Sequence, residues 1–297
     1  MKSEKGYPLA SAFMTHQLLR TETVGLTVDG VPDIQYVCAI IESHLSRRRR
    51  LLITFVNPAS VAVARTQPAY QTSLGSFDLV LPDGWAMSTA IRLVHWIRAN
   101  RISFDATSLA PHVLTIAERR GASVALIGGL PGCTSQAALR LREVHPKIRI
   151  VRCYDGYGDT KQKAVELAEL QPDIVICGMG AGAQEMLLLD LAKQGWNGCG
   201  FTCGGYFDQL LHSYEYYPKW IDASNLRWAY RLSKEPRRLW RRYLLDYPVF
   251  VGKFSRQLIH GWVRNRSAKT CISERKANAS RIGDARGLGA PHMKVDK

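Results

Sequence analysis

The chain has 297 residues, of which 46% are hydrophobic and 22% charged, and its formal net charge is +15. This size and composition are typical of a globular protein with one large domain or two small ones. They exclude a membrane-spanning helix, because no stretch reaches the ~18 uninterrupted apolar residues that such a helix needs, and the N-terminus is too polar for a signal peptide.

The hydrophobic pattern then alternates along the chain between short apolar runs and segments with helical spacing. Strands are expected within residues 24–31, 51–60, 77–84, 122–132, 148–159, 172–185 and 197–211. Helices are expected within residues 32–45, 60–74, 85–100, 111–121, 133–146 and 160–171. Strands that alternate with helices of this length predict an α/β, Rossmann-like fold, in which a mostly parallel sheet has helices on both faces.

Polar or Gly-rich residues follow six of the predicted strands. In a parallel sheet the carboxyl ends of the strands meet at one edge, which is where ligands bind. We therefore expect one ligand site at this edge. The residues concerned are Asn57, Asp83, Gly128–Gly129, Asp155–Gly156, Gly178–Gln184 and Gly204–Asp208.

Asp83 stands out in the stretch "FDLVLPDGWAM", because the carboxylate directly follows an apolar strand and precedes Gly84. One interpretation is turn chemistry, since Asp-Gly commonly ends a strand. The other is a general base, presented on a turn at the edge where the ligand binds. The residues by themselves leave both interpretations open.

The Gly-rich turns "LIGGLPG" and "GMGAGAQE" also allow two interpretations. Their backbone amides could approach a phosphate or nucleotide closely, or the glycines could allow close packing of helix on strand. Neither turn matches a complete dinucleotide-binding or ATP-binding motif. Gly128 and Gly129 are therefore candidate ligand-binding residues, and so is Asp208 in the last predicted turn.

No metal site is expected. The seven cysteines are odd in number and lack zinc or redox spacing, so we expect them to be reduced, in a cytoplasmic protein. No Asp-x-Asp pair or His/Asp cluster suggests a divalent cation. If the ligand contains a diphosphate, Arg101 and the amide-rich turns would have to hold it.

The positive charge is concentrated near the C-terminus. Residues 1–226 contain 22 Lys and Arg against 20 Asp and Glu, whereas residues 227–297 contain 18 against 5. This predicts an appendage that faces an anionic partner, either nucleic acid or membrane lipid. The stretch "EPRRLWRRYLLDYPVF" is either a solvated basic helix or an interfacial helix with Trp and Tyr at the depth of the headgroups.

These patterns divide the chain into four predicted regions. Residues 1–24 form an N-terminal extension and residues 25–222 the α/β catalytic domain. Residues 223–263 form the basic, aromatic appendage, and residues 264–297 form a polar tail that we expect to be disordered.

Several motifs occur together in a recognisable order: "FVNP", "LPDGWA", "RISFDATSL", "VALIGGLPG", "DGYGD", "DIVICGMGAGAQE", "GGYFD" and "LRWAYRLSKEPRRLWRRY". From about residue 25 to 250 the chain resembles the WecG/TagA/CpsF glycosyltransferase family. The resemblance implies transfer of a sugar from a UDP-sugar to a saccharide on polyprenyl diphosphate, with inversion and without a metal or cofactor. It also implies surface-polysaccharide synthesis by a cytoplasmic protein that lies peripherally on the inner face of the cell membrane.

The resemblance also assigns roles to single residues. It implies that Asp83 is the catalytic base and that Asn57, Arg101 and Gln184 bind donor or acceptor. From the appendage, it implies that Arg231, Arg238 and Arg241 reach the acceptor's diphosphate and the anionic membrane surface.

Three motifs depart from the family pattern. Phe55 stands where the family has Thr, and Gly182 and Ala183 replace Pro and Lys. The stretch "GFTCGGYFDQLLHS" lacks the last Gly of the corresponding family motif. Two of the alternatives therefore remain close to the family: an active transferase with altered sugar choice, or a non-catalytic member that binds UDP-sugar. Outside the family, the alternatives are a nucleic-acid-binding α/β protein and a nucleotide-dependent oxidoreductase. The expected partners include no nucleic acid, and a homo-oligomer is left open.

Overall fold

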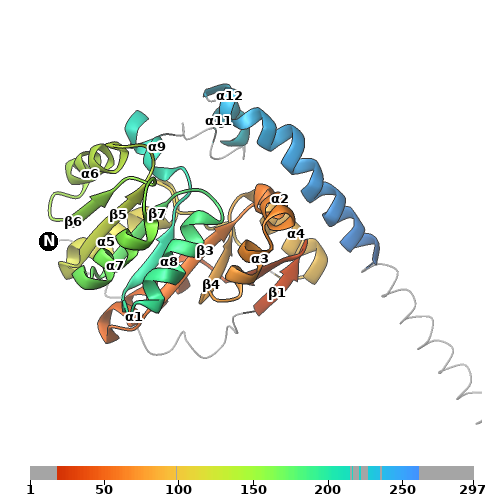
Figure 1. The fold of residues 1–297 in the computed structure, drawn as a ribbon. Helices are drawn as coiled ribbons and strands as arrows, with labels where there is room; N and C mark the ends of the chain where they lie inside the picture. The colour runs from red at the N-terminus through yellow and green to blue at the C-terminus, as the bar shows by residue number, and fades with distance from the viewer. Residues whose placement is uncertain are drawn as a thin grey trace, which may run out of the picture. The chain divides into compact units, whose positions relative to one another are not determined.

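A six-stranded parallel sheet forms the centre of the chain in the computed structural model (Figure 1). Its strand order is β4-β3-β8-β7-β5-β6, and every neighbouring pair runs parallel. All six residues of β3 are buried, as expected for a strand covered on both faces. The strands are β3 (Leu51–Val56), β4 (Leu79–Pro82), β5 (Ser123–Gly128), β6 (Arg149–Tyr154), β7 (Ile174–Gly178) and β8 (Cys199–Thr202).

The structure describes residues 19–97, 99–214, 216, 221, 227–234 and 236–260. The predicted tail at 264–297 and most of the predicted N-terminal extension lie outside these ranges. The chain divides into two units, Met1–Lys253 and Phe254–Lys297. Of the second unit only residues 254–260 are described, and they are helical. The sheet and everything described below belong to the first unit.

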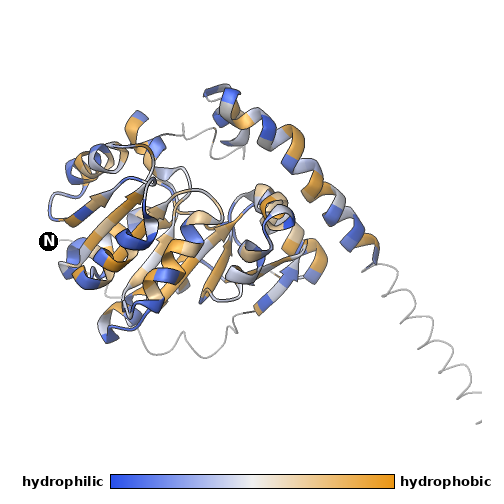
Figure 2. Cartoon of the chain, viewed as in Figure 1, coloured by the Kyte–Doolittle hydropathy of each residue, from blue (hydrophilic) through white to orange (hydrophobic). Residues whose placement is uncertain are grey.

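Helices cover both faces of the sheet, which confirms the predicted α/β fold. One face packs on α1 (Ile34–Arg47), α5 (Leu109–Arg120), α6 (Cys133–Val144) and α9 (Tyr206–His212), which share one apolar core with alternate strand residues. The other face packs on α2 (Pro58–Thr66), α3 (Pro68–Leu74), α7 (Thr160–Leu170) and α8 (Ala183–Lys193). The hydropathy colouring shows apolar residues concentrated on the strands and on the helix faces that meet them (Figure 2).

The helix predicted within residues 85–100 is shorter than the pattern suggests. Helix α4 (Trp85–His95) ends where Trp96 adopts a left-handed conformation, with φ of 59°. The following loop returns to the end of β4, because the Ile102 amide donates to the Pro82 carbonyl at 3.0 Å. This return brings Arg101 to the carboxyl edge of the sheet.

A short hairpin covers the outer edge of β4. It consists of β1 (Leu19–Thr23) and β2 (Leu26–Gly30), and β1 falls in the region that the sequence assigned to an extension. Asp29 on β2 is fully buried and accepts two hydrogen bonds from Arg20, at 2.8 and 2.9 Å. It also accepts the Val80 amide at 2.7 Å, so the carboxylate satisfies a backbone donor on the sheet's edge strand.

The C-terminal segment continues in the same unit as the sheet as far as Lys253. Helices α11 (Arg227–Lys234) and α12 (Pro236–Arg241) are followed by the π-helical turn η2 (Arg242–Asp246) and by helical residues 247–253. Within the described residues, no helix is both long enough and apolar enough to cross a bilayer.

The hairpin's attachment gives a stability prediction. Asp29→Ala should lower the free energy of unfolding by about 2 to 3 kcal/mol, because the Val80 amide and the Arg20 guanidinium lose a charged acceptor. Urea denaturation measures this loss. The control is Asp190→Ala, which removes only an exposed pair with Lys193 and should cost under about 1 kcal/mol. Equal losses in the two variants would contradict the role given to Asp29.

Candidate functional site

A cleft of about 1220 Å³ opens at the carboxyl edge of the sheet. The strand ends that the sequence predicts to converge do line this one cleft. From the predicted set, the lining includes Asn57, Asp83, Arg101, Gly129, Gly156, Gly178, Gln184, Gly204, Asp208 and Arg231.

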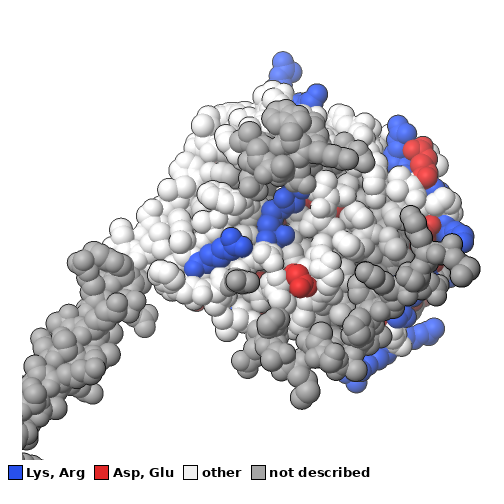
Figure 3. Space-filling model, turned by 180° about the vertical axis from the view of Figure 1, so that it is seen from behind, with Lys and Arg blue, Asp and Glu red and all other residues white. Residues whose placement is uncertain are grey.

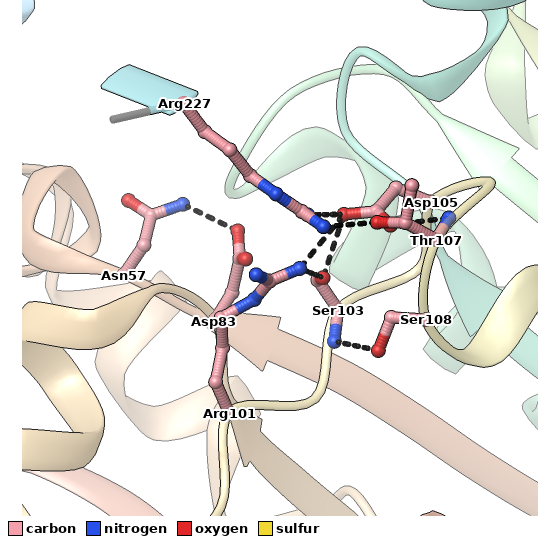
Figure 4. Close-up of polar contacts among 8 residues, drawn as sticks. All are labelled: Asn57, Asp83, Arg101, Ser103, Asp105, Thr107, Ser108 and Arg227. Atoms are coloured by element: carbon pink, nitrogen blue, oxygen red, sulfur yellow. Dashed lines mark hydrogen bonds and ion pairs between the residues drawn. The ribbon is translucent and has the colours of Figure 1, made fainter. Parts of the chain in front are cut away.

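Asp83 and Asn57 face each other at the ends of two neighbouring strands (Figure 4). The Asn57 Nδ2 donates to Asp83 Oδ2 at 3.4 Å. Asn57 is also the N-cap of α2, because its Oδ1 accepts the Ala59 amide at 3.0 Å. Since that cap requires an oxygen, the NH2 group of Asn57 must point toward Asp83. Capping thus fixes the side chain that orients the carboxylate.

Asp83 is held from the backbone side as well. Its amide donates to the Val56 carbonyl at 2.8 Å, and Gly84 then takes φ of 90°, a conformation that favours glycine. The side chain is half-buried and lines the cleft. Asp83 therefore does occupy an Asp-Gly turn, and that turn presents the carboxylate to the cleft with room for a ligand beside it.

A second carboxylate, Asp105, lies between two arginines (Figure 4). Arg227 Nη1 donates to Asp105 Oδ2 at 2.8 Å, and Arg101 Nη2 approaches the same oxygen at 3.4 Å. Ser103 and Thr107 donate to the carboxylate through their hydroxyls, at 2.7 and 2.9 Å. Arg101 comes from the loop after α4 and Arg227 opens α11, so Asp105 joins the C-terminal segment to the cleft wall.

The charge state of Asp105 follows from these partners. Burial by itself would raise the pKa of the carboxyl, but Arg227 and Arg101 oppose this and hold the pKa below its ordinary value. Asp105 is therefore ionised at neutral pH. Its charge is shared by the two guanidinium groups, which remain in the lining of the cleft.

Gln184 lies at the cleft floor, where its side chain bridges two loops. Its Nε2 donates to Glu185 at 3.1 Å, and its Oε1 accepts the Gly204 amide at 3.2 Å. Glu185 is fully buried, which raises the pKa of its carboxyl. It accepts the Thr54 hydroxyl at 2.8 Å and the Gly182 amide at 2.7 Å. Gln184 thus ties the loops after β7 and β8 together at the place where a ligand would rest.

The predicted glycines lie where three strand ends approach closely. A Cβ on Gly128 would lie 2.2 Å from the Gly178 carbonyl oxygen. The Gly129 amide donates to the same oxygen at 3.1 Å, and the Gly156 amide donates to Gly129 at 2.9 Å. The Gly129 and Gly156 amides are thus used between the strand ends. Gly129 lines the cleft. Gly128 does not, and its lack of a side chain allows the end of β5 to approach Gly178 closely.

Asp208 lies in the first turn of α9 and lines the cleft beside Cys133, whose Sγ lies 3.9 Å from its carboxylate. Burial first, and then the charge of Asp208, raise the pKa of the Cys133 thiol, so this cysteine remains protonated. All the cysteines whose state the structure describes are free.

The C-terminal segment lines the cleft with aromatic, apolar and charged side chains. Arg231 lies in this lining. Arg241 does not, since it is exposed and its guanidinium stacks on Trp240 at 5.5 Å. The side chain of Arg238 lies outside what the structure describes. From this segment the lining consists of Arg227, Trp228, Arg231, Leu232, Leu239, Tyr243, Leu244, Asp246 and Tyr247.

The departures at Phe55 and at Gly182–Ala183 have local consequences. Phe55 joins an aromatic cluster, with its ring centroid 6.2 Å from that of Phe104. Gly182 has φ of 95°, and a Cβ there would lie 2.6 Å from the Gln67 side chain. Proline requires a φ near −65° and could not adopt this backbone. The loop before Gln184 therefore has a conformation that the family's Pro could not take. Ala183 begins α8 without a cation.

The charges in the cleft are mixed. Its described lining contains three arginines and four aspartates: Arg101, Arg227, Arg231, Asp83, Asp105, Asp208 and Asp246. On the face drawn in Figure 3, basic side chains likewise occur in small groups, and some lie beside acidic ones. Within the described ranges, three or more His, Cys, Asp or Glu side chains nowhere gather as a metal site would require.

Sequence reasoning missed Asp105, Arg227 and Asp246. The first two occur in motifs that were noted, "RISFDATSL" and "LRWAYRL", but they lie 122 positions apart and neither motif reveals its partner. Asp246 follows the last recognised motif, and no signal in the sequence distinguishes it from a surface acid.

Comparisons with known proteins identify the family of the chain. The model of the "Glycosyl transferase WecG/TagA/CpsF family" matches residues 21–264. The chain is 31% identical over 208 residues to the UDP-Gal:alpha-D-GlcNAc-diphosphoundecaprenol beta-1,4-galactosyltransferase of Shigella boydii, which covers 68% of this chain and 85% of the relative.

Two further relatives carry the name N-acetylglucosaminyldiphosphoundecaprenol N-acetyl-beta-D-mannosaminyltransferase. The protein from Bacillus spizizenii is 27% identical, over 73% of this chain and 83% of its own. The protein from Bacillus subtilis is 26% identical, over 71% of this chain and 82% of its own. The chain belongs to the WecG/TagA/CpsF family of glycosyltransferases.

Proposed function

We propose that this protein transfers a sugar from a UDP-sugar to a saccharide linked to polyprenyl diphosphate, with inversion at the anomeric carbon and without a metal. The observation that carries the proposal is the half-buried Asp83, oriented by Asn57, in a cleft that also contains Arg101, Arg227 and Arg231. One base and several phosphate-binding cations are what direct displacement requires.

In the proposed reaction, Asp83 removes the proton from the acceptor hydroxyl. The resulting oxygen attacks the anomeric carbon from the face opposite UDP, so one C–O bond forms as the bond to UDP breaks. Negative charge develops on the leaving diphosphate, and the arginine guanidinium groups stabilise it through charge-assisted hydrogen bonds. Asn57 keeps the carboxylate directed at the acceptor.

The relatives support the choice of substrates. Their names specify acceptors in which N-acetylglucosamine is joined to undecaprenol by diphosphate, and one name specifies UDP-galactose as donor. For this chain we propose an N-acetylglucosaminyl diphosphate lipid as acceptor and a UDP-hexose as donor, in the synthesis of an exopolysaccharide, capsule or related surface polymer.

The C-terminal segment supports a peripheral position on the cytoplasmic face of the membrane. Trp228, Trp240 and Leu244 are 48%, 44% and 67% exposed, and they alternate with arginines. Aromatic and aliphatic side chains of this kind enter the headgroup region while arginines bind anionic lipid, each contributing about 1 kcal/mol. The lipid-linked acceptor would then reach the cleft without leaving the bilayer.

The test measures UDP release from a panel of UDP-sugars, with N-acetylglucosaminyl diphosphate on a short polyprenol as acceptor. We expect release that depends on the acceptor, and the best donor names the transferred sugar. UDP binding without release from any donor would indicate a non-catalytic member. Absence of UDP binding would overturn the proposal and favour the nucleic-acid-binding alternative.

Asp83→Asn should reduce UDP release at least ~100-fold, because asparagine cannot accept the proton. Affinity for UDP, measured by isothermal titration calorimetry, should change less than about threefold, since Asp83 acts on the acceptor. The matched control is Asp190→Asn on the surface of α8, which should retain full activity. A variant at Asp83 that keeps most of its activity would exclude this residue as the base.

Asn57→Asp separates the two tasks of Asn57. Aspartate caps helices as well as asparagine does, so the free energy of unfolding should stay within about 1 kcal/mol of wild type. A carboxylate in place of the amide cannot donate to Asp83 and repels it, so UDP release should fall about tenfold. Unchanged turnover would show that Asn57 does not act on the base.

Asp105→Asn should uncouple α11 from the cleft wall. Because Arg227 is left buried without its full counter-charge, the variant should lose about 3 kcal/mol of stability at pH 7. The lowered pKa of Asp105 means that its ionised form stabilises the fold at neutral pH and that this contribution is lost as pH falls through that pKa. Denaturant titrations should therefore show the two proteins converging below about pH 4. A gap independent of pH would contradict the ion pair.

A further inference from the structure

The π-helical turn η2 places an unusual combination of side chains in the cleft. Tyr243 and Asp246 from η2 and the next residue, Tyr247, all belong to the lining. The rings of Tyr243 and Tyr247 meet edge to face with centroids 4.8 Å apart, and Trp228 packs against Tyr243 at 5.9 Å. The wider turn of a π-helix alters which side chains share a face, and such turns occur frequently at functional sites.

Asp246 differs from Asp105 and Asp83, the other two carboxylates considered in the cleft, in its hydrogen-bond partners. Asp105 is saturated by two arginines and two hydroxyls, and Asp83 is oriented by Asn57. Within the described part of the chain, by contrast, Asp246 makes no hydrogen bond or ion pair. It is half-buried and belongs to the lining of the cleft, so its carboxylate is available to a ligand there.

The chemistry of this group suits one part of the substrates. A carboxylate repels a diphosphate, so Asp246 would not serve the phosphates that the arginines bind. It accepts hydrogen bonds from neutral hydroxyls, with two oxygens available. Aromatic rings beside it offer an apolar surface to the C–H face of a sugar ring. A carboxylate that accepts hydrogen bonds from hydroxyls, next to aromatic rings, forms a surface that recognises carbohydrate.

We propose that Tyr243, Asp246 and Tyr247 form the subsite for the acceptor's sugar ring. This inference rests on the proposed function. The turn also carries Leu244 and Leu245, which are 67% and 56% exposed. A ligand that reaches η2 therefore passes an apolar surface suited to a lipid, whereas the donor nucleotide would occupy the strand ends around Gly129 and Gly178.

The experiment compares two lipids, N-acetylglucosaminyl diphosphate on a short polyprenol and the same polyprenyl diphosphate without the sugar. Their binding to wild type, Asp246→Asn, Tyr247→Ala and the control Asp190→Asn is measured in detergent by isothermal titration calorimetry. We expect Asp246→Asn to weaken binding of the sugar-bearing lipid about tenfold, as loss of a charged hydrogen bond would, and to leave the sugarless lipid unchanged. Tyr247→Ala should act in the same direction.

Equal weakening for the two lipids, or none, would overturn the subsite, because a general disturbance of the turn cannot depend on the sugar. Turnover gives the second readout: the KM for acceptor should rise about tenfold in Asp246→Asn while the KM for donor stays within about twofold. A rise in the donor KM instead would also overturn it. Failure of the proposed function would appear separately, as absent UDP release by wild type, and the binding comparison would still decide the subsite.

Discussion

The site depends on the ion pairs that the buried carboxylate of Asp105 makes with Arg227 and Arg101. It accepts hydrogen bonds from Ser103 in the loop after α4 and from Arg227 on α11, and it is close to fully buried. A buried charge is tolerated only with partners in good geometry, so the loop after α4 and the start of α11 must be ordered together. Once Arg227 is fixed in this way, the positions of Arg231 and of the aromatic residues that follow are constrained by the geometry of α11.

Asn57 likewise connects two parts of the site, through a single side-chain amide. The side-chain oxygen of Asn57 caps α2 by accepting the Ala59 amide, and the side-chain nitrogen of the same group faces Asp83. A local rule of helix capping therefore determines the orientation of a side chain in the cleft. Behind it, the close approach of Gly128 to Gly178 brings neighbouring strand ends near enough for one ligand to touch several of them.

Much of the fold could be predicted, because buried parallel strands are apolar throughout and the helices between them have clear spacing. The residues that line the edge of the cleft could be predicted from the same pattern, since the carboxyl ends of parallel strands lie at one edge of the sheet. Strand β1 was missed because its sequence, LRTET, is short and mostly exposed. Helix α8 was not predicted as an element of its own, because it begins inside a Gly-rich turn. Asp105 and Arg227 could not be paired, because only the folded chain joins them. The sequence left the Gly129 amide open to a ligand or to close packing, and in the structure it donates to Gly178 at the end of the neighbouring strand.

The hairpin that covers β4 has a consequence for how the molecule behaves among its own copies. Open strand edges invite pairing between chains, and proteins prevent this by covering the edge or by placing charges on it. Here one edge is covered through the single carboxylate of Asp29, whereas the other, β6, exposes Arg149 and Arg152. Protection against pairing between chains thus depends on the buried Asp29 at the β4 edge. At the β6 edge it depends on arginines that repel the same arginines of another copy. Damage to the hairpin would first appear as self-association, before the sheet itself is lost.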